Sequence, residues 1–361
     1  MLGFKKRFLS INRLTTFLVS PLILAELIGC RGQTRKDMGI EHPNRITVEF
    51  ARRISLEESM EATIGQIADV VVDSSGNLFI GDNSDGKVKK FDASGKFLGS
   101  LSRAADTPFV ITGLCLDEEG SIYVSDVSTY SILRYSSTGK LIDKFRTDDS
   151  TLFFLGMCRV YNTRLYVGTL EKRFDPSEMY RSTLVGIYDG MSGHQIGRFG
   201  FYDTNYKELC PLSPEARFDI DMKGNVYIVQ RNSPRVFRFD SDGRYLSTFD
   251  SHPSDFVLPT TPMPRHDFDR RFEWMKGISS MDYVKAVDKY VLTQFVNYNP
   301  KGSFLSVYST TGEVFGSELS LPGKLRYAYH DSLYVEVDST ENNQSMGTRI
   351  DVYTLHPKLS E

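Results

Sequence analysis

The sequence lacks the short motifs that identify several common enzyme and nucleic-acid-binding classes. It contains no Gly-x-Ser-x-Gly, no phosphate-binding loop and no Cys-x-x-Cys, and its six histidines show neither His-x-His nor His-Glu-x-x-His spacing. The formal net charge is −3 and no block of Lys and Arg follows the N-terminal segment, so nothing indicates a nucleic-acid partner. There is one tryptophan, Trp274, among 361 residues.

The residues that are present indicate a globular, aromatic-rich protein. Hydrophobic residues make up 40%, aromatic residues 12% and charged residues 25% of the chain, which excludes a disordered or collagen-like polypeptide. Length alone would favour two domains, but the repeats described below favour one.

The N-terminal segment has the pattern of an export signal. Lys5, Lys6 and Arg7 precede an apolar stretch over 17–25, which is shorter than the roughly 20 residues that a membrane-spanning helix needs. The segment ends in Leu27-Ile28-Gly29-Cys30, which resembles the bacterial lipobox, in which two aliphatic residues and a small residue precede the acylated cysteine.

The resemblance to the lipobox implies that residues 1–29 are a lipoprotein signal peptide and that Cys30 carries the lipid. Several acyl chains on one cysteine would give a stable membrane anchor. Residues 30–45 are polar and are expected to form a flexible tether. The alternative is a chance apolar stretch with an unmodified Cys30.

A pattern of one aliphatic residue, two others, an aromatic residue and an oxygen-bearing residue recurs six times. Its aromatic positions, at each of which we expect a core residue, are Phe91, Tyr135, Tyr188, Phe239, Tyr308 and Tyr353. In five copies a glycine follows within five residues, which is typical of a tight turn between two strands.

A second hairpin precedes each copy of this pattern. It is clearest where three apolar residues, Val70 to Val72, are followed by Asp73-x-x-Gly76-Asn77 and a second apolar strand. Copies three, five and six lack the glycine but keep the second strand. Each repeat therefore predicts four antiparallel strands joined by short turns.

The strand count predicts how the ring of repeats closes. The sixth repeat supplies only three strands, expected over 325–329, 333–337 and 349–355, whereas an extra strand with alternating residues stands at 46–51. We expect 46–51 to be the outer strand of the last repeat, because it would cover an open sheet edge. The predicted fold is an all-β, six-bladed β-propeller that occupies residues 46–361 as a single domain.

The repeat and its turns resemble the NHL-repeat or TolB-like six-bladed propellers. Together with the lipobox, the chain resembles the propeller lipoproteins of Bacteroides-type bacteria. This resemblance implies a cell-envelope protein, anchored by lipid to the outer membrane on either its periplasmic or its outer side.

The long loops are all expected on one face of the propeller, since the other face carries the short turns. These loops cover 170–184, 201–217, 251–277, 294–303 and 338–348. Long loops that gather on one face of a rigid scaffold commonly form a binding site, although drift on an unconstrained surface would also explain them.

Within these loops, cationic and aromatic residues are candidates for binding an anionic or sugar-like ligand. The candidate ligand-binding residues are Arg173, Arg181, His266, Arg270, Arg271 and Trp274. The alternative is a proline-stiffened surface loop over 251–277 with solvated charges, in which Trp274 anchors the loop to the core.

The resulting hypothesis is a non-catalytic binding or scaffold protein that engages an unidentified protein or small molecule on its loop face. No catalytic residue, metal site or cofactor is predicted. The alternative is a calcium-type hydrolase similar to the gluconolactonase-like propellers, whose channel cation could here be held by Asp69, Asp219 or Asp282. Cys115 and Cys158 occupy matching positions in adjacent repeats, and two buried thiols are favoured over a disulfide.

Overall fold

The computed structural model describes residues 45–101, 108–146, 152–171, 182–206, 216–250, 253–264, 267–299, 301–337 and 349–358. Cys30, Arg173, Arg181 and His266 lie outside these residues. Among the residues described, no helix has the length and apolar composition needed to cross a membrane.

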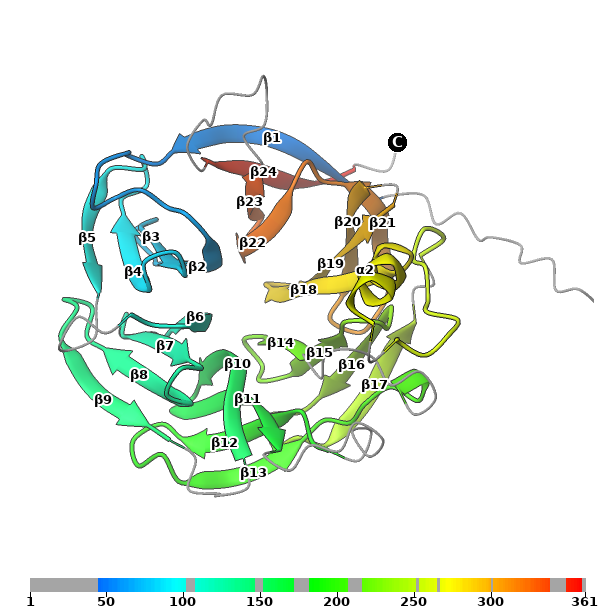
Figure 1. Cartoon of the computed structure of the whole chain (residues 1–361), viewed down its shortest axis with the longest axis horizontal. Coiled ribbons are helices and arrows are strands. Elements are labelled where there is room, and N and C mark those ends of the chain that lie inside the picture. The colour runs from blue at the N-terminus through cyan, green and yellow to red at the C-terminus, as the bar shows by residue number, and fades with distance from the viewer. Residues whose placement is uncertain are drawn as a thin grey trace, which may run out of the picture. The chain divides into compact units, whose positions relative to one another are not determined.

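Six four-stranded antiparallel sheets form a ring, so the predicted six-bladed β-propeller is confirmed (Figure 1). Within each blade we letter the strands a to d from the channel outward. Blades 1 and 2 contain β2 (Ile67–Val72), β3 (Leu78–Asp82), β4 (Lys87–Phe91), β5 (Phe97–Leu101), β6 (Ile111–Leu116), β7 (Ile122–Asp126), β8 (Ser131–Tyr135) and β9 (Leu141–Phe145). Blades 3 and 4 contain β10 (Leu152–Tyr161), β11 (Arg164–Glu171), β12 (Val185–Asp189), β13 (Gln195–Phe199), β14 (Ala216–Ile220), β15 (Val226–Gln230), β16 (Arg235–Phe239) and β17 (Tyr245–Asp250). Blade 5 contains β18 (Ser279–Val287), β19 (Tyr290–Tyr298), β20 (Lys301–Ser309) and β21 (Val314–Ser320).

Blade 6 joins the two ends of the ring. It contains β22 (Lys324–Tyr329), β23 (Ser332–Val337), β24 (Arg349–Pro357) and, as its outer strand, β1 (Ile46–Ser55). The pairing of β1 with β24 runs from Ile46 opposite Pro357 to Ser55 opposite Arg349. The closing strand is therefore where the sequence predicts it, and it extends four residues further than the predicted 46–51.

The core consists of apolar clusters that lie between neighbouring blades. Each of six clusters combines side chains of two adjacent blades, for example Leu292 of blade 5 with Leu333 of blade 6. Burying one such side chain stabilises the fold by about 1.5–3 kcal/mol, which makes each blade dependent on both neighbours.

The recurrent aromatic residue of strand c is a core residue in five blades and half-buried in the sixth. The five fully buried rings are those of Phe91, Tyr135, Tyr188, Phe239 and Tyr308. In blade 6, Tyr353 packs edge-on against Phe50 of β1, with ring centroids 5.7 Å apart, and Phe50 is itself 54% exposed. Tyr353 thus meets the expectation of a core position in part: it packs against the cluster between blades 5 and 6 but is only partly buried.

The two faces of the ring differ in their connections. We call the face with the a–b and c–d turns the turn face, and the opposite face the loop face. The turn-face glycines have left-handed backbones, as at Gly224 with φ 81°. In the copies without glycine, two-residue turns begin at Asn162, Asp288 and His330, which adopt φ between 47° and 51°. These are residue types that tolerate this conformation better than most.

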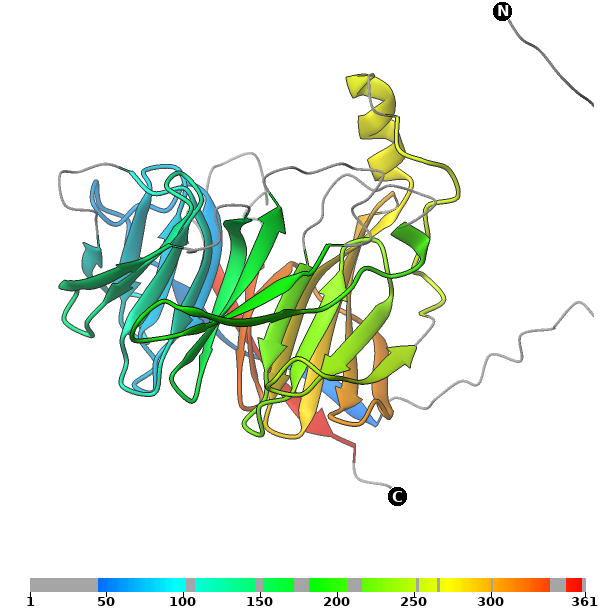
Figure 2. The same cartoon turned by 90° about the horizontal axis from the view of Figure 1, so that it is seen from below.

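The one described helix rises from the loop face. Helix α2 (Phe268–Lys276) follows the proline-rich stretch between blades 4 and 5 and projects beyond the strands (Figure 2). The Asp267 carboxylate caps it by accepting the N–H of Arg270, and Gly277 follows its last turn. The expectation of a loop throughout 251–277 is therefore corrected at its C-terminal end.

Cys115 of β6 and Cys158 of β10 are buried free thiols whose Sγ atoms lie 3.0 Å apart. They belong to the cluster between blades 2 and 3. Burial, with the neighbouring Cys158, raises the pKa of the Cys115 thiol well above its usual value.

Candidate ligand-binding site on the loop face

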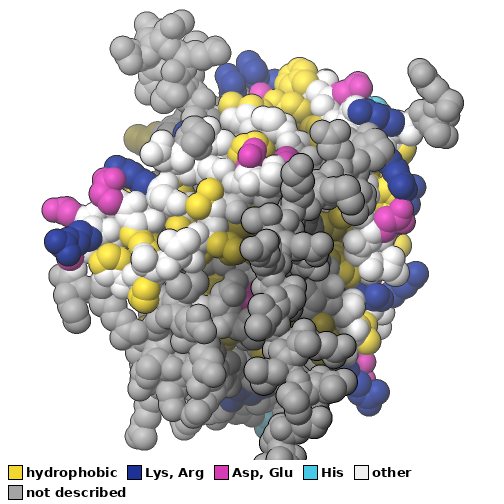
Figure 3. Space-filling view, turned by 90° about the vertical axis from the view of Figure 1, so that its right-hand side faces the viewer, with side chains coloured by type: hydrophobic (Ala, Val, Ile, Leu, Met, Phe, Trp, Pro, Cys, Tyr) yellow, Lys and Arg dark blue, Asp and Glu magenta, His cyan; other side chains and the backbone are white. Residues whose placement is uncertain are grey.

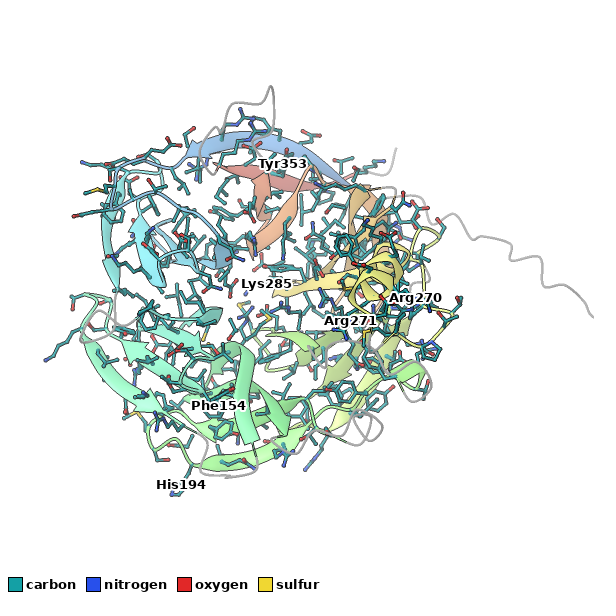
Figure 4. All side chains as sticks on the ribbon, in the orientation of Figure 1. Phe154, His194, Arg270, Arg271, Lys285 and Tyr353 are labelled. Carbon is teal, nitrogen blue, oxygen red and sulfur yellow. The ribbon has the colours of Figure 1, made fainter. Side chains whose placement is uncertain are left out.

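Helix α2 carries three of the predicted binding residues, and they point in different directions. Figure 4 shows Arg270 and Arg271 on the helix. The Arg270 side chain is 80% exposed and pairs with Asp267 at 3.3 Å, while Arg271 Nε donates to the carbonyl oxygen of Pro264 at 3.5 Å. Trp274 donates its indole N–H to the carbonyl oxygen of Thr261 at 3.0 Å, which fixes the orientation of the ring.

Trp274 lines a cavity of about 340 Å³ between α2 and the loop-face ends of blades 4 and 5, which we call the α2 pocket. Its volume falls in the range of small-molecule sites, about 300–1,000 Å³. Arg270 and Arg271 are not among its lining residues. The lining residues are Arg231, Asn232, Phe272, Trp274, Met275, Lys276, Ile278, Ser280 and Tyr298.

Aromatic and aliphatic side chains make up most of the wall of the α2 pocket. Phe272 and Tyr298 are 48% and 47% exposed, which leaves apolar ring surface open to solvent. Figure 3, which views the side of the molecule that carries α2, shows hydrophobic side chains exposed between charged ones. Lys276 is already engaged, since it pairs with Glu273 at 2.9 Å and its Nζ lies 4.4 Å from the centroid of the Phe272 ring.

Arg231 is the cation of the α2 pocket that has no carboxylate partner within the described part of the chain. Its Nε donates to the Ser280 hydroxyl at 3.1 Å, and its backbone carbonyl oxygen accepts the N–H of Met281 at 2.7 Å. These bonds join the loop after β15 to β18 and position the guanidinium at the wall of the pocket. Sequence reasoning missed Arg231, because a single arginine in a short loop has no distinguishing pattern.

The three carboxylates suggested as ligands of a channel cation form hydrogen bonds or ion pairs with other residues of the chain. Asp219 of blade 4 contacts Arg159 of blade 3 and Lys285 of blade 5, and its Oδ2 accepts the N–H of Ala286 at 2.8 Å. Burial would raise the pKa of Asp219, but Lys285, Arg159 and the hydrogen bonds outweigh it and hold that pKa below its usual value. Lys285 lies in the centre of the ring in Figure 4.

The other two carboxylates accept hydrogen bonds of their own, and Asp69 also acts on Arg159 through its charge. Asp69 accepts the N–H groups of Val70 and Leu114 at 2.9 and 2.8 Å, and Asp282 accepts the Ser280 hydroxyl. Among the residues that the structure describes, no group of three or more His, Cys, Asp or Glu side chains could hold a metal ion. Asp69, Asp219 and Asp282 therefore do not form the ligand set that a calcium-type hydrolase requires.

Comparison with solved structures gives matches along nearly the whole ring. A member of the DUF4221 family from Bacteroides vulgatus matches with a TM-score of 0.67 at 11% identity, covering 87% of this chain and 98% of that one. A Bacteroides fragilis protein assigned as exported matches with a TM-score of 0.56 at 12% identity, covering 86% and 96%. A calcium-binding protein, regucalcin, from Agrobacterium tumefaciens matches with a TM-score of 0.51 at 13% identity, covering 86% and 96%.

These likenesses show the fold. At such low identity they assign neither a ligand nor an activity. No family model matches the sequence, and no curated protein matches it either.

Proposed function

We propose that this protein is a non-catalytic binding protein of the cell envelope. In this proposal the α2 pocket takes a small ligand that combines an apolar ring with an anionic group. The observation that carries the proposal is Arg231, a cation without a carboxylate partner among the described residues, set in a wall of aromatic side chains.

The two parts of the pocket favour the two parts of such a ligand. Phe272, Trp274 and Tyr298 offer ring faces and edges, and aromatic pairs contribute about 0.5–1.5 kcal/mol each beyond the area that they bury. The guanidinium of Arg231 uses Nε for Ser280 and can offer the N–H groups of its terminal nitrogens to a carboxylate, sulfonate or phosphate. Because Arg231 has no carboxylate partner among the described residues, an anion can bind to it without breaking an existing ion pair.

The envelope location in this proposal rests on the predicted export signal and the resemblance to a lipobox, and the likeness to a Bacteroides fragilis protein assigned as exported supports it. The described chain begins at the turn face, where Arg45 pairs with Glu313 at 2.7 Å and its carbonyl oxygen accepts the N–H of Lys358. Residue 45, from which the chain leads back towards Cys30, thus lies on the turn face, opposite the face that carries the α2 pocket.

Lipidation is tested by expressing the full chain and a Cys30→Ser variant in a Gram-negative host. We expect the native chain to partition with membranes and with detergent, and the variant to be recovered in the aqueous fraction. A variant that still partitions with membranes would contradict the anchor while leaving the binding proposal intact.

The binding proposal is tested with 8-anilinonaphthalene-1-sulfonate, which carries apolar rings and one anionic group. Trp274 is the only tryptophan, so energy transfer from its indole to the bound probe reports on this pocket directly. We expect saturable binding that weakens by about tenfold in Arg231→Gln, because the sulfonate loses its charged partner.

Two controls make the test specific. The neutral analogue N-phenyl-1-naphthylamine should bind native protein and Arg231→Gln with the same affinity within about twofold, since it has no charge to lose. Arg270→Gln removes an exposed arginine of the same helix and should leave both affinities unchanged. Equal sulfonate affinity in native protein and Arg231→Gln would overturn the proposal.

A further inference from the structure

A second cavity, of about 570 Å³, lies between blades 5 and 6 on the loop face. It shares the lining residue Tyr298 with the α2 pocket, so the two cavities adjoin at this residue. It also shares Asp282, Lys324 and Arg326 with a narrow space of about 40 Å³ in the channel. A ligand in this second cavity would therefore have access to the channel-lining charges.

Lys324, the first residue of β22, is held in place by a buried amide from blade 5. The Gln294 side chain accepts the N–H of Leu325 at 2.9 Å and donates to the carbonyl oxygen of Gly323 at 2.9 Å. The Ser303 hydroxyl donates to the same carbonyl oxygen at 2.9 Å. The backbone on both sides of Lys324 is thus fixed, and its side chain starts from a rigid position.

The ammonium group of Lys324 has neither a hydrogen bond nor an ion pair among the described residues. The other charged side chains around this ammonium group form hydrogen bonds or ion pairs with other residues. Glu336 pairs with Arg326, whose guanidinium also donates to the carbonyl oxygens of Ile67 and Ala68 in blade 1. Asp282 accepts the Ser280 hydroxyl.

The surroundings of Lys324 disfavour its positive charge. Burial lowers its pKa, and the nearby guanidinium groups of Arg326 and Arg217 lower it further, while Asp282 and Glu336 act in the opposite direction. The net result is a pKa below the usual value. A partly buried cation of this kind gains most from a bound negative charge.

We propose that Lys324 marks a second binding site, in which its ammonium group binds a carboxylate or phosphate oxyanion within the cavity between blades 5 and 6. The Tyr298 hydroxyl, which has no hydrogen-bond partner in the described chain, lines the same cavity and is a second donor for a ligand that reaches the rim. This site uses β18, β19, β20, β22 and β23, and Arg231 is not among its lining residues. An experiment that disproves this second site would therefore leave the proposal for the α2 pocket intact, and the reverse also holds.

The test follows the Cε resonance of Lys324 by NMR in full-length protein labelled with ¹³Cε-lysine. Acetate and inorganic phosphate are added separately, with chloride keeping the ionic strength constant. The resonance is identified by its absence in Lys324→Met. We expect a saturable shift with one or both oxyanions and, at saturation, a higher pKa of Lys324, because the bound charge stabilises the ammonium form.

Variants at two neighbouring positions separate the site from general screening. Lys301→Met removes an exposed lysine from the rim of the same cavity and should change the affinity by less than about twofold. Asp282→Asn removes a negative charge that faces Lys324 and should strengthen oxyanion binding by about three- to tenfold.

Three results would overturn the proposal. They are a shift that chloride alone reproduces, oxyanion binding that titration calorimetry finds undiminished in Lys324→Met, and an unchanged affinity in Asp282→Asn. If Lys324→Met does not fold, the native protein and Asp282→Asn decide the matter, since both keep the lysine. Sulfonate binding at the α2 pocket is measured in Lys324→Met and Lys301→Met, whose side chains do not line that pocket, and should not change.

Discussion

The turn face and the loop face use the same kinds of polar side chain over different distances along the chain. On the turn face, the Asp221 carboxylate accepts the N–H groups of Lys223 and Asn225, two and four residues further on. On the loop face, the Gln294 amide binds Leu325, which is 31 residues away and in the next blade. The Asp221 turn is therefore stabilised within its own repeat, whereas the Gln294 amide holds two neighbouring blades together.

This comparison predicts its largest effect at Gln294. Replacing Gln294 by Ala leaves the N–H of Leu325 and part of the hydrogen bonding of Gly323 unsatisfied in the interior, and opens a cavity. We expect a loss of about 3 kcal/mol in the free energy of unfolding, measured by urea denaturation. Ser303→Ala, which removes the hydrogen bond to Gly323 and the one that the Ser303 hydroxyl accepts from the Gln294 amide, should cost about 1–2 kcal/mol.

An intermediate effect is expected at Asp82, at the loop-face end of β3. Its buried carboxylate accepts the N–H groups of Gly65 and Gln66 and pairs with Lys89 at 2.9 Å. Burial would raise the pKa of Asp82, but hydrogen bonds from Ser84 and Gln66 and the ammonium group of Lys89 lower it to about 2.

Because this pKa is below the unfolded value, the ionised carboxylate contributes stability above about pH 4 and loses it as the pH falls towards 2. The contribution at stake is about 2 kcal/mol. Thermal unfolding at pH 5, 4, 3 and 2 measures it against Asp82→Asn, whose stability is lower at pH 5 and should fall less steeply. Parallel pH profiles for the two proteins would show that Asp82 is not the group responsible.

The smallest effect is expected at Asp240, in an exposed turn of blade 4. Among the residues described, its carboxylate accepts the N–H groups of Asp242 and Arg244 and no others. Asp240→Ala should lower the free energy of unfolding by about 1 kcal/mol or less, and Asp240→Asn should retain most of the stability, since Asn also forms such turns. A loss as large as that of Gln294→Ala would break the contrast between the faces.

The same contrast explains what could be predicted from the sequence. Alternating apolar residues and Asp-x-x-Gly turns act within a few residues, so the blades and the closing strand β1 were predictable from local patterns. Helix α2 also had local signals, with Asp267 before it and Gly277 after it, but the prolines at 253, 259, 262 and 264 favoured a loop.

The candidate site was predicted less completely. Trp274 stood out as the only tryptophan and does line the α2 pocket. Arg231 and Lys324 lie in unremarkable sequence, and their significance depends on the absence of a carboxylate partner among the described residues. Whether a cation has a carboxylate partner depends on which blades are neighbours, because the carboxylate can come from any adjacent strand. No residue spacing within one repeat encodes that neighbourhood.

Closure of the ring through β1 and β24 also sets the order in which the protein can be assembled. During synthesis β1 emerges before every other strand of the propeller, and its partner β24 emerges last. Blades 1 to 5 can each form from consecutive strands, but blade 6 must wait for β24, and until then β1 and the apolar face of blade 1 that packs against blade 6 remain uncovered. Pairing of the nine-residue strand β24 with β1 therefore completes the ring. The incomplete ring, whose strand edges are open, is the state most exposed to aggregation and proteolysis.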